Sequence, residues 1–441
     1  MSGLDSLTTV SQADGIANRR TFLKIAVGAG AAVVLSAAPG AAWAATSAAA
    51  DPRAPAARTR VYVLVIDGCR PDEITPELTP RLHALRTQGV NFPAARSLPI
   101  METIPNHVMM MTGVRPDRSG VPANAVYDRA EGVVRNLDRP SDLRFPTVLE
   151  RLRTGGLTTG SVLSKEYLFG IFGERATYRW EPAPLVPVSG HAPDQFTMDA
   201  LIAMVTASDP DLVFANFGDI DRFGHSDETG SSVKIARTAS LARSDSQIGR
   251  FVDHLVTVGL WESSVIMVLA DHSMDWSIPS NLISIDLILQ DHPELREQVV
   301  IGQNGGADLV YWVGSDAGRA AGLAEVRALV TAHEGVLAVH EPAELRLGAN
   351  AGNLVAYCRA GWRFSDPGVL SNPIPGNHGH PTTEPIPFFI SGGSPRVRTG
   401  ITLSDSARTM DVAPTVAAFF GLAAPAGGYD GVDRAVAFTS V

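Results

Sequence analysis

The sequence predicts an α/β fold with a mainly parallel central sheet and helices on both faces. Short segments made almost entirely of apolar residues recur along the chain, as expected of strands that are buried on both faces. These segments alternate with stretches of helical periodicity, which is the pattern of a parallel sheet covered by helices. The 441-residue chain is 45% apolar, so it has enough apolar material for a large core.

The expected strands are the apolar runs Val61–Ile66, Thr158–Leu163, Leu212–Phe217, Val265–Ala270, Leu309–Val313 and Phe388–Ser391. The expected helices between them are Thr79–Gln88, Phe145–Arg153 and Ser240–Val258. A last helix is expected after Asp411, which stands in a capping position, with Pro414 in its first turn and Gly421 at its end.

One large domain over residues 60–425 is the simplest organisation, because no internal repeat is visible. Residues 275–371 have a weaker pattern, which indicates a small inserted subdomain built onto the main sheet. Residues 426–441 are expected to form a C-terminal tail.

The first 44 residues have the features of a removable export signal. Arg19 and Arg20 precede Lys24, a short Gly/Ala/Val run follows, and Ala42-Trp43-Ala44 forms an A-x-A cleavage site. The paired arginines followed by Phe-Leu-Lys are similar to a twin-arginine signal, so the export machinery of that route is an expected partner. The apolar run is too short for a membrane span, which argues against a stable membrane anchor. We therefore expect a periplasmic, cell-wall or extracellular protein, joined to its signal by a linker over residues 45–59.

The charge disfavours one class of protein, and the number of cysteines excludes another. The formal net charge is −10, and removal of the signal makes it about −11, which disfavours a general nucleic-acid binder. Cys69 and Cys358 are the only cysteines, so a disulfide framework is excluded. Two free, buried thiols are expected, although the sequence leaves a Cys69–Cys358 pair open.

Acidic and imidazole side chains follow several of the expected strands. Ligands in open parallel sheets gather at the carboxyl ends of the strands, so these side chains are expected to meet. Three carboxylates and three imidazoles buried together would leave charge uncompensated unless cations lay among them. The set consists of Asp67, Asp221, His225, Asp271, His272 and His378.

The spacing of these residues favours a site for two divalent metal ions. Asp221 and His225 are four residues apart, so one helical turn places them on one face. Nitrogen and oxygen ligands together suit Zn²⁺, with Mn²⁺ or Fe as alternatives, and fit Mg²⁺ or Ca²⁺ less well. Six side chains are too many for one catalytic zinc that keeps an open position.

Thr103 is the candidate nucleophile. Pro105 suits a first helical turn, so Thr103 is expected at or just before a helix N-terminus, where backbone N–H groups favour an anion. A metal-activated hydroxyl at this position could attack phosphorus. The alternative is an ordinary N-cap threonine.

Six motifs in this order resemble the nucleotide pyrophosphatase/phosphodiesterase branch of the alkaline phosphatase superfamily. The resemblance covers residues 60–425 and implies an alkaline-phosphatase-like fold with the inserted subdomain already expected. The motifs are Val65-Ile-Asp67-Gly-Cys-Arg-Pro-Asp, Thr103-Ile-Pro-Asn-His, Met111-Thr-Gly-Val-Arg-Pro-Asp, Asp221-Arg-Phe-Gly-His225, Ala270-Asp271-His272-Ser-Met and Gly376-Asn-His378-Gly.

The resemblance implies two zinc ions and a covalent phospho-threonine intermediate on Thr103. It assigns one metal to Asp221, His225 and His378, and the other to Asp67, Asp271 and His272 together with the Thr103 oxygen. Asn124 would donate a hydrogen bond to a phosphoryl oxygen of the substrate, with the Ile104 N–H as a second donor.

Three residues bear on the substrate. Members that cleave nucleotides usually have Phe after the nucleophile, where this chain has Ile104, so a nucleotide preference is in doubt. Asp219 stands where many members have Glu, and is expected either near a metal ligand or in solvent. Lys165 is similar to a substrate-contacting lysine of phosphonoacetate hydrolases, although a surface lysine at a helix start is the alternative.

Three functions are compatible with these residues. The first is a secreted two-metal hydrolase of phosphate diesters or pyrophosphates, acting on a small phosphate ester. The second is a phosphonoacetate hydrolase or phosphomonoesterase on the same scaffold, for which Lys165 would supply the extra cation that a dianion needs. The third is a non-catalytic metal- or phosphate-binding protein. The chain has no Cys-x-Pro-x-Arg motif, so a sulfatase is disfavoured.

Overall fold

The computed structural model describes residues 44–45, 58–187, 189–226, 235–366 and 375–439. The predicted export signal and most of the predicted linker lie outside these residues. Among the helices of the described part, none combines the length and the apolar character needed to cross a membrane.

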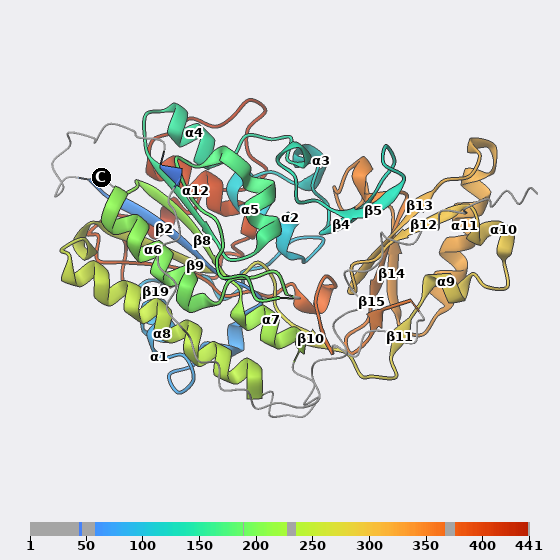
Figure 1. Cartoon of the computed structure of the whole chain (residues 1–441), viewed down its shortest axis with the longest axis horizontal. Helices are drawn as coiled ribbons and strands as arrows, with labels where there is room; N and C mark the ends of the chain where they lie inside the picture. The colour runs from blue at the N-terminus through green and yellow to red at the C-terminus, as the bar shows by residue number, and fades with distance from the viewer. Residues whose placement is uncertain (1–43, 46–57, 188, 227–234, 367–374, 440–441) are drawn as a thin grey trace, which may run out of the picture.

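A nine-stranded, mainly parallel sheet forms the centre of the larger lobe, as predicted (Figure 1). Its inner strands run parallel to one another, and β18 is antiparallel to β9. The strands, in spatial order, are β1 (Ala44–Ala45), β7 (Tyr178–Trp180), β6 (Thr159–Leu163), β8 (Leu212–Phe217), β2 (Arg60–Ile66), β9 (Ser264–Leu269), β18 (Phe388–Ser391), β3 (Val90–Asn91) and β19 (Ile401–Thr402).

Helices cover both faces of this sheet (Figure 1). One layer consists of α1 (Pro80–Gln88), α6 (Asp194–Ser208) and α8 (Ile235–Thr257). The other consists of α2 (Thr103–Thr112), α4 (Val148–Thr154), α5 (Glu166–Phe172) and α12 (Val412–Phe419), with α3 (Pro116–Ser119) beside it. β2, β8 and β9 are fully buried between these layers, which explains their continuous apolar sequences.

A smaller lobe forms within residues 275–371, where the sequence indicates an inserted subdomain (Figure 1). Its sheet is antiparallel and carries a separate hydrophobic core. The strands, in spatial order, are β12 (Val299–Gly302), β13 (Ala307–Trp312), β15 (Leu354–Cys358) and β14 (Val336–His340), and the helices are α9 (Ile285–Ile288), α10 (Pro293–Arg296) and α11 (Asp316–Ala332). The expected strand Leu309–Val313 is therefore β13 of this second sheet and not part of the central one.

Short paired strands connect the lobes or border them. They are the hairpin β4 (Ala125–Asp128) with β5 (Val133–Asn136), the antiparallel pair β10 (Asp275–Trp276) with β17 (Gly376–Asn377), and the parallel pair β11 (Leu282–Ile283) with β16 (Arg363–Phe364). The chain enters the smaller lobe just after β10 and returns from it at β17, so this pair holds the two crossing segments together.

The start of α4 differs from the expectation, α8 is already helical at Ile235 rather than from the expected Ser240, and α12 starts as expected but is capped differently. The segment predicted as Phe145–Arg153 begins at Val148, because Thr147 forms a capping box with Glu150. Asp411 precedes α12, but its carboxylate makes no capping bond to the helix. It accepts instead from Arg434 Nε at 3.0 Å, which ties the predicted C-terminal tail to the domain.

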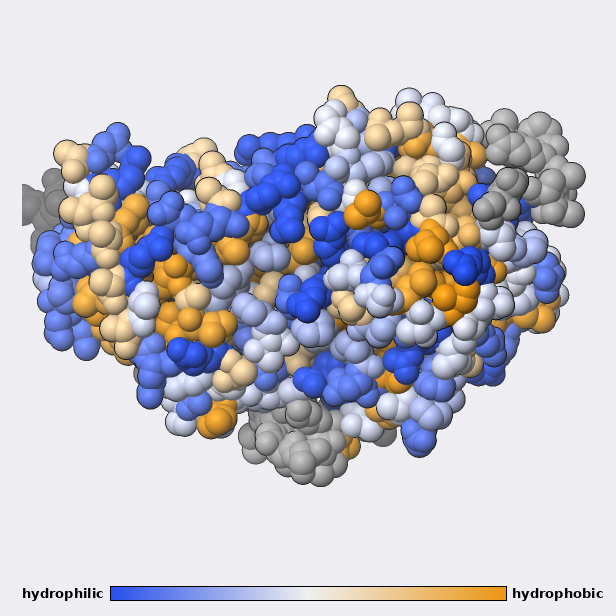
Figure 2. Space-filling model, turned by 180° about the vertical axis from the view of Figure 1, so that it is seen from behind, coloured by the Kyte–Doolittle hydropathy of each residue, from blue (hydrophilic) through white to orange (hydrophobic). Residues whose placement is uncertain are grey.

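The surface mixes hydrophilic and hydrophobic residues over both lobes, as the rear face in Figure 2 shows. The larger exposed apolar side chains are distributed over many elements. Single exposed apolar residues are normal for a globular protein and call for no special explanation.

Candidate metal centre and nucleophile

Three strands of the central sheet deliver carboxylates to the same edge. Asp67 directly follows β2, and Asp271 lies two residues after the end of β9. Asp221 lies in α7 (Asp219–Ser226), which begins two residues after β8. Because β2 lies between β8 and β9 and runs parallel to both, the carboxyl ends of the three strands meet. Figure 1 shows α2, α7 and β10 between this edge and the smaller lobe.

The predicted ligands converge into two groups, divided as the resemblance implies. Asp221, His225 and His378 form one group, and Asp67, Asp271 and His272 form the other. Within each group, one potential ligand atom of every residue lies within 4.8 Å of the others. The prediction that Asp221 and His225 share a helix face agrees with the structure, since His225 Nε2 lies 3.2 Å from Asp221 Oδ1.

Each carboxylate has one oxygen bound by the protein and one without a hydrogen-bond partner. Asp67 Oδ2 accepts from Asn216 Nδ2 and is paired with Lys165 Nζ, both at 2.8 Å. Asp221 Oδ2 accepts from Lys165 Nζ at 2.8 Å, and Asp271 Oδ1 accepts from two backbone N–H groups at 3.0 and 3.1 Å. Within the part of the chain that the structure describes, the oxygens without a hydrogen-bond partner are Asp67 Oδ1, Asp221 Oδ1 and Asp271 Oδ2. Buried oxygens of this kind are costly unless a cation binds them, so the residues fit a metal centre.

The three histidines are oriented in the same way. In each ring Nδ1 faces a backbone carbonyl, which can only accept, so Nδ1 carries the proton and Nε2 keeps its lone pair. The Nδ1 contacts are His225 to Gly376 O at 2.9 Å, His272 to Ser273 O at 2.9 Å and His378 to Met101 O at 3.2 Å. This arrangement is the one by which proteins fix the tautomer of a metal-binding histidine.

Burial keeps two of these imidazoles neutral. It lowers the pKa of His272 to about 4, and it lowers the pKa of His378 well below the usual value, helped by the neighbouring His272 and His225. Both rings are therefore in the neutral, metal-binding form at pH 7. Burial alone would raise the pKa of Asp221, but Lys165 and His225 hold the pKa of that carboxyl well below its usual range.

Thr103 lies beside His272 of one ligand group and beside Lys165, which contacts Asp221 of the other. It is the first residue of α2, and the N-cap position is occupied by Glu102, whose side chain makes no capping bond. Thr103 Oγ1 lies 3.3 Å from His272 Nε2 and 3.4 Å from Lys165 Nζ. The alternative of an ordinary N-cap threonine is therefore wrong. His107 supports the helix, since its Nδ1 lies 2.8 Å from the Thr103 carbonyl oxygen.

Lys165 occupies the centre of the site, so the alternative of a surface lysine is wrong. It does precede α5, but its side chain is fully buried. Its ammonium group is held between Asp67 and Asp221 and thus connects one ligand group to the other. Burial lowers the pKa of Lys165, but Asp221 and Asp67 outweigh this effect and raise it, so the group stays charged.

The Ile104 N–H, expected as a second donor to the substrate, is arranged differently from the expectation. The Ile104 N–H donates to Asn124 Oδ1 at 2.8 Å, so it holds the amide in place and is already used as a donor. The Asn124 N–H donates to Glu102 Oε2 at 2.6 Å. The Ile104 side chain packs in the main hydrophobic core and is 1% exposed, so it offers a ligand almost no surface.

Sequence reasoning missed two buried residues that hold this site together. Asn216 in β8 bonds Asp67 and also lies with its Nδ2 at 2.9 Å from His107 Nε2. Arg237 in α8 donates to the carbonyls of Gly68 and Ile220, which directly adjoin two ligand aspartates. An amide near the end of an otherwise apolar strand was the available signal for Asn216, whereas nothing in the sequence distinguished Arg237.

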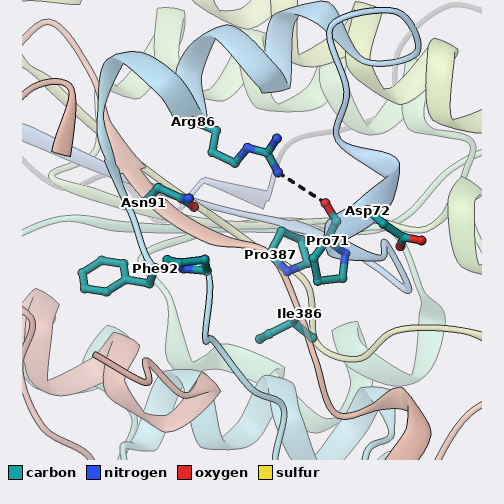
Figure 3. Close-up of a pocket in the computed structure, with 8 residues that line it drawn as sticks. Pro71, Asp72, Arg86, Asn91, Phe92, Ile386 and Pro387 are labelled. Carbon is teal, nitrogen blue, oxygen red and sulfur yellow. Dashed lines mark hydrogen bonds between the residues drawn. The ribbon is translucent and has the colours of Figure 1, made fainter. Parts of the chain in front are cut away.

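Other polar residues named from the sequence lie outside the two ligand groups. Asp219 is buried rather than solvated, and its Oδ1 lies 3.1 Å from His191 Nε2. Cys69 and Cys358 are free and buried, as expected. A pocket of about 330 Å³ opens between Pro71, Arg86, Phe92 and Pro387 (Figure 3), and its lining contains none of the predicted site residues.

The central sheet and the two ligand groups agree with the alkaline-phosphatase-like fold and site that the resemblance implies. Residues 61–380 match the Type I phosphodiesterase / nucleotide pyrophosphatase family, and the chain belongs to this family. It is 23% identical over 265 residues to human ectonucleotide pyrophosphatase/phosphodiesterase family member 5, covering 57% of this chain and 54% of that protein. It is also 23% identical over 240 residues to bovine bis(5'-adenosyl)-triphosphatase ENPP4, covering 52% and 50%. The chain thus spans about half the length of the curated relatives it matches.

Solved structures agree with this fold. Murine ENPP5 superimposes with a TM-score of 0.72 at 18% identity, covering 86% of this chain and 100% of that one. An inactive threonine-to-alanine variant of murine ENPP5 in complex with AMP gives a TM-score of 0.73 at 18% identity, covering 87% and 100%.

Proposed function

We propose that the protein is an exported two-metal hydrolase of phosphate diesters or pyrophosphates that acts through a phospho-threonine intermediate on Thr103. The observation that carries the proposal is the convergence of three unpartnered carboxylate oxygens and three imidazole Nε2 atoms beside one buried hydroxyl. Family membership supports the same reaction class, and the curated relatives include one named bis(5'-adenosyl)-triphosphatase.

Zinc is the proposed metal, because each ligand group combines carboxylate oxygen with imidazole nitrogen. Asp221, His225 and His378 would hold one ion, and Asp67, Asp271 and His272 would hold the other. When bound, the ions would neutralise charge and favour an in-line arrangement of attacking and leaving oxygens.

In the proposed reaction, Thr103 Oγ1 loses its proton to solvent and forms a bond to phosphorus, while the bond to the leaving-group oxygen breaks. The leaving group takes that electron pair, and water then hydrolyses the phospho-threonine and restores the hydroxyl. The Lys165 ammonium, 3.4 Å from Oγ1, stabilises negative charge on this oxygen. Asn124, held by the Ile104 N–H, would donate to a phosphoryl oxygen.

Thr103→Ala tests the nucleophile. The variant should lose hydrolysis of bis-p-nitrophenyl phosphate by at least about a thousandfold, while elemental analysis still finds close to two zinc ions. Thr112→Ala is the matched control, since Thr112 is a buried threonine at the other end of the same helix. Turnover that survives in Thr103→Ala would refute a nucleophilic threonine.

A phosphonate or monoester hydrolase is the second candidate, favoured by one observation: a buried lysine lies within 3.4 Å of Thr103 Oγ1. Comparison of bis-p-nitrophenyl phosphate, p-nitrophenyl phosphate and phosphonoacetate separates the two candidates. The diester should be hydrolysed fastest, and a higher rate on either of the others would reverse the ranking.

Export by the twin-arginine route is also part of the proposal, together with a periplasmic, cell-wall or extracellular location without a membrane anchor. Replacing both Arg19 and Arg20 with Lys should retain the full-length protein in the cytoplasmic fraction. Unchanged export of this double variant would exclude the route.

A further inference from the structure

Arg222 places a positive charge next to the metal centre, and some of its N–H donors have no acceptor among the described residues. Its Nη2 donates to the Tyr167 hydroxyl oxygen at 3.3 Å, and its Nε is buried without a hydrogen-bond partner in the described part of the chain. The guanidinium side chain is 23% exposed, so a bound ligand could reach it. A guanidinium has five N–H donors in a planar fork, most of which remain available here.

The neighbouring carboxylate of Asp221 forms only a long ion pair with Arg222. Asp221 Oδ2 lies 4.0 Å from Arg222 Nε, which is too long for a hydrogen bond. The same oxygen already accepts from Lys165 Nζ at 2.8 Å, and the other oxygen of Asp221 faces the metal group. Arg222 is therefore paired with Asp221 at long range and makes no hydrogen bond to a carboxylate among the described residues.

Tyr167 completes a small polar cluster with Arg222. The Arg222 Cζ lies 5.8 Å and the Lys165 Nζ 5.9 Å from the centre of the tyrosine ring. The Tyr167 oxygen accepts from Arg222, which leaves its own proton to be donated. Lys165 adds to the positive potential, but it is fully buried and its ammonium already contacts Asp67, Asp221 and Thr103.

We propose that Arg222 and Tyr167 form an anion subsite that binds a second anionic group, a carboxylate or a phosphate, of the substrate attacked by Thr103. The planar guanidinium matches two oxygens of either group, and the tyrosine hydroxyl supplies another donor. A simple diester carries one charge and would leave this subsite empty. The inference rests on the proposed function and narrows it to phosphate esters that carry a further charged group near the scissile bond.

Three p-nitrophenyl diesters with the same leaving group test the subsite. The second ester group is ethyl in one probe, carboxymethyl in the next and 2-phosphoethyl in the third. The zinc-loaded enzyme should show a kcat/KM roughly ten- to a hundredfold higher for at least one charged probe than for the ethyl probe, as expected for charge-assisted hydrogen bonds. The charged probe that is preferred distinguishes a carboxylate ligand from a phosphate.

The ratio of kcat/KM for the preferred charged probe to kcat/KM for the ethyl probe should depend on Arg222. Arg222→Met should bring this ratio close to one, Arg222→Lys should keep part of it, and Tyr167→Phe should lower it a few-fold. Arg319→Met is the matched control, because Arg319 pairs with Asp316 on the exposed surface of α11, and it should keep the full ratio.

Binding gives a readout that is independent of turnover. Zinc-loaded Thr103→Ala protein should bind phosphonoacetate roughly ten- to a hundredfold more tightly than propylphosphonate by calorimetry, and the double variant with Arg222→Met should lose the difference. Equal turnover of all three diesters overturns the subsite, as does a preference that survives Arg222→Met. Failure of the wild-type enzyme to hydrolyse any of the three diesters overturns the proposed function instead.

Discussion

Replacement of the buried Arg237 should weaken the fold and the metal centre together. Its guanidinium donates to Gly68 O at 2.7 Å and to Ile220 O at 3.0 Å, and it pairs with Glu73 Oε1 and Oε2 at 2.6 and 2.7 Å. Gly68 adjoins Asp67 and Ile220 adjoins Asp221, so one side chain from α8 fixes the backbone next to both ligand groups.

The size of the effect follows from the groups left behind in Arg237→Met. Two carbonyls lose a donor, and each buried acceptor left unpaired costs about 1–3 kcal/mol. Glu73 keeps a backbone donor, the Arg70 N–H at 2.8 Å, but loses its cation. The expected loss in the free energy of unfolding is therefore about 3–5 kcal/mol, a large part of the 5–15 kcal/mol typical of a domain. Loosened aspartates should also weaken zinc binding about ten- to a hundredfold.

Guanidinium chloride denaturation of the metal-free protein measures the first effect, followed by tryptophan fluorescence, since Arg237 lies 5.2 Å from the centre of the Trp276 ring. Competition with a chromogenic chelator measures the second. Arg250→Met is the control: the side chain lies in the same helix, is 42% exposed and pairs with Asp199, so it should cost under about 1 kcal/mol. If both variants are equally stable and bind zinc equally well, Arg237 does not hold the site.

Two further predictions concern close packing and pH. A Cβ on Gly376 would lie 2.4 Å from Gly224 O and 2.6 Å from His225 Cα, so Gly376→Ala should cost about 1–3 kcal/mol and weaken zinc binding, whereas Gly318→Ala in α11 should do neither. Burial, reinforced by Asp219, raises the pKa of Asp194 to about 8, so the folded state keeps a proton that the unfolded state loses above about pH 4. The contribution of Asp194 to the free energy of unfolding is therefore fully present below about pH 4. It decreases by up to about 5 kcal/mol as the pH rises from about 4 to about 8. Asp194→Asn should flatten this decline in denaturation series at pH 5 and pH 8, and an unchanged slope would contradict the assignment.

The parts of the fold that the sequence predicts are those encoded locally. The runs that became β2, β8 and β9 are apolar because helices cover both faces of the sheet, and an aspartate after each run is visible without tertiary information. β13, which contains most of the run Leu309–Val313, is also buried on both faces, between the second core and the main core, but burial does not reveal strand direction. Its place in a separate antiparallel sheet could therefore not be read from composition.

The residues that were missed or misjudged depend on distances across the fold. Lys165 precedes a helix, where most lysines are solvated, and only the convergence of Asp67 and Asp221 makes its burial favourable. The donors on Arg237 satisfy backbone carbonyls, which any residue could provide, so no sequence pattern marks it. We expected the Ile104 N–H to donate to the substrate, and the sequence does not show that it already donates to Asn124 Oδ1.

The pairing of β10 with β17 fixes where the chain leaves the larger lobe and where it rejoins it. Asp275 pairs with Asn377 and Trp276 with Gly376, so the departing and returning segments are fastened at the boundary of the larger lobe. His378 follows β17 directly, and Gly306 of the smaller lobe packs against its backbone. Because Gly306 packs against the backbone of His378, and β13 and β15 contribute side chains to the main core, a change of shape in the smaller lobe would be transmitted directly to a metal ligand.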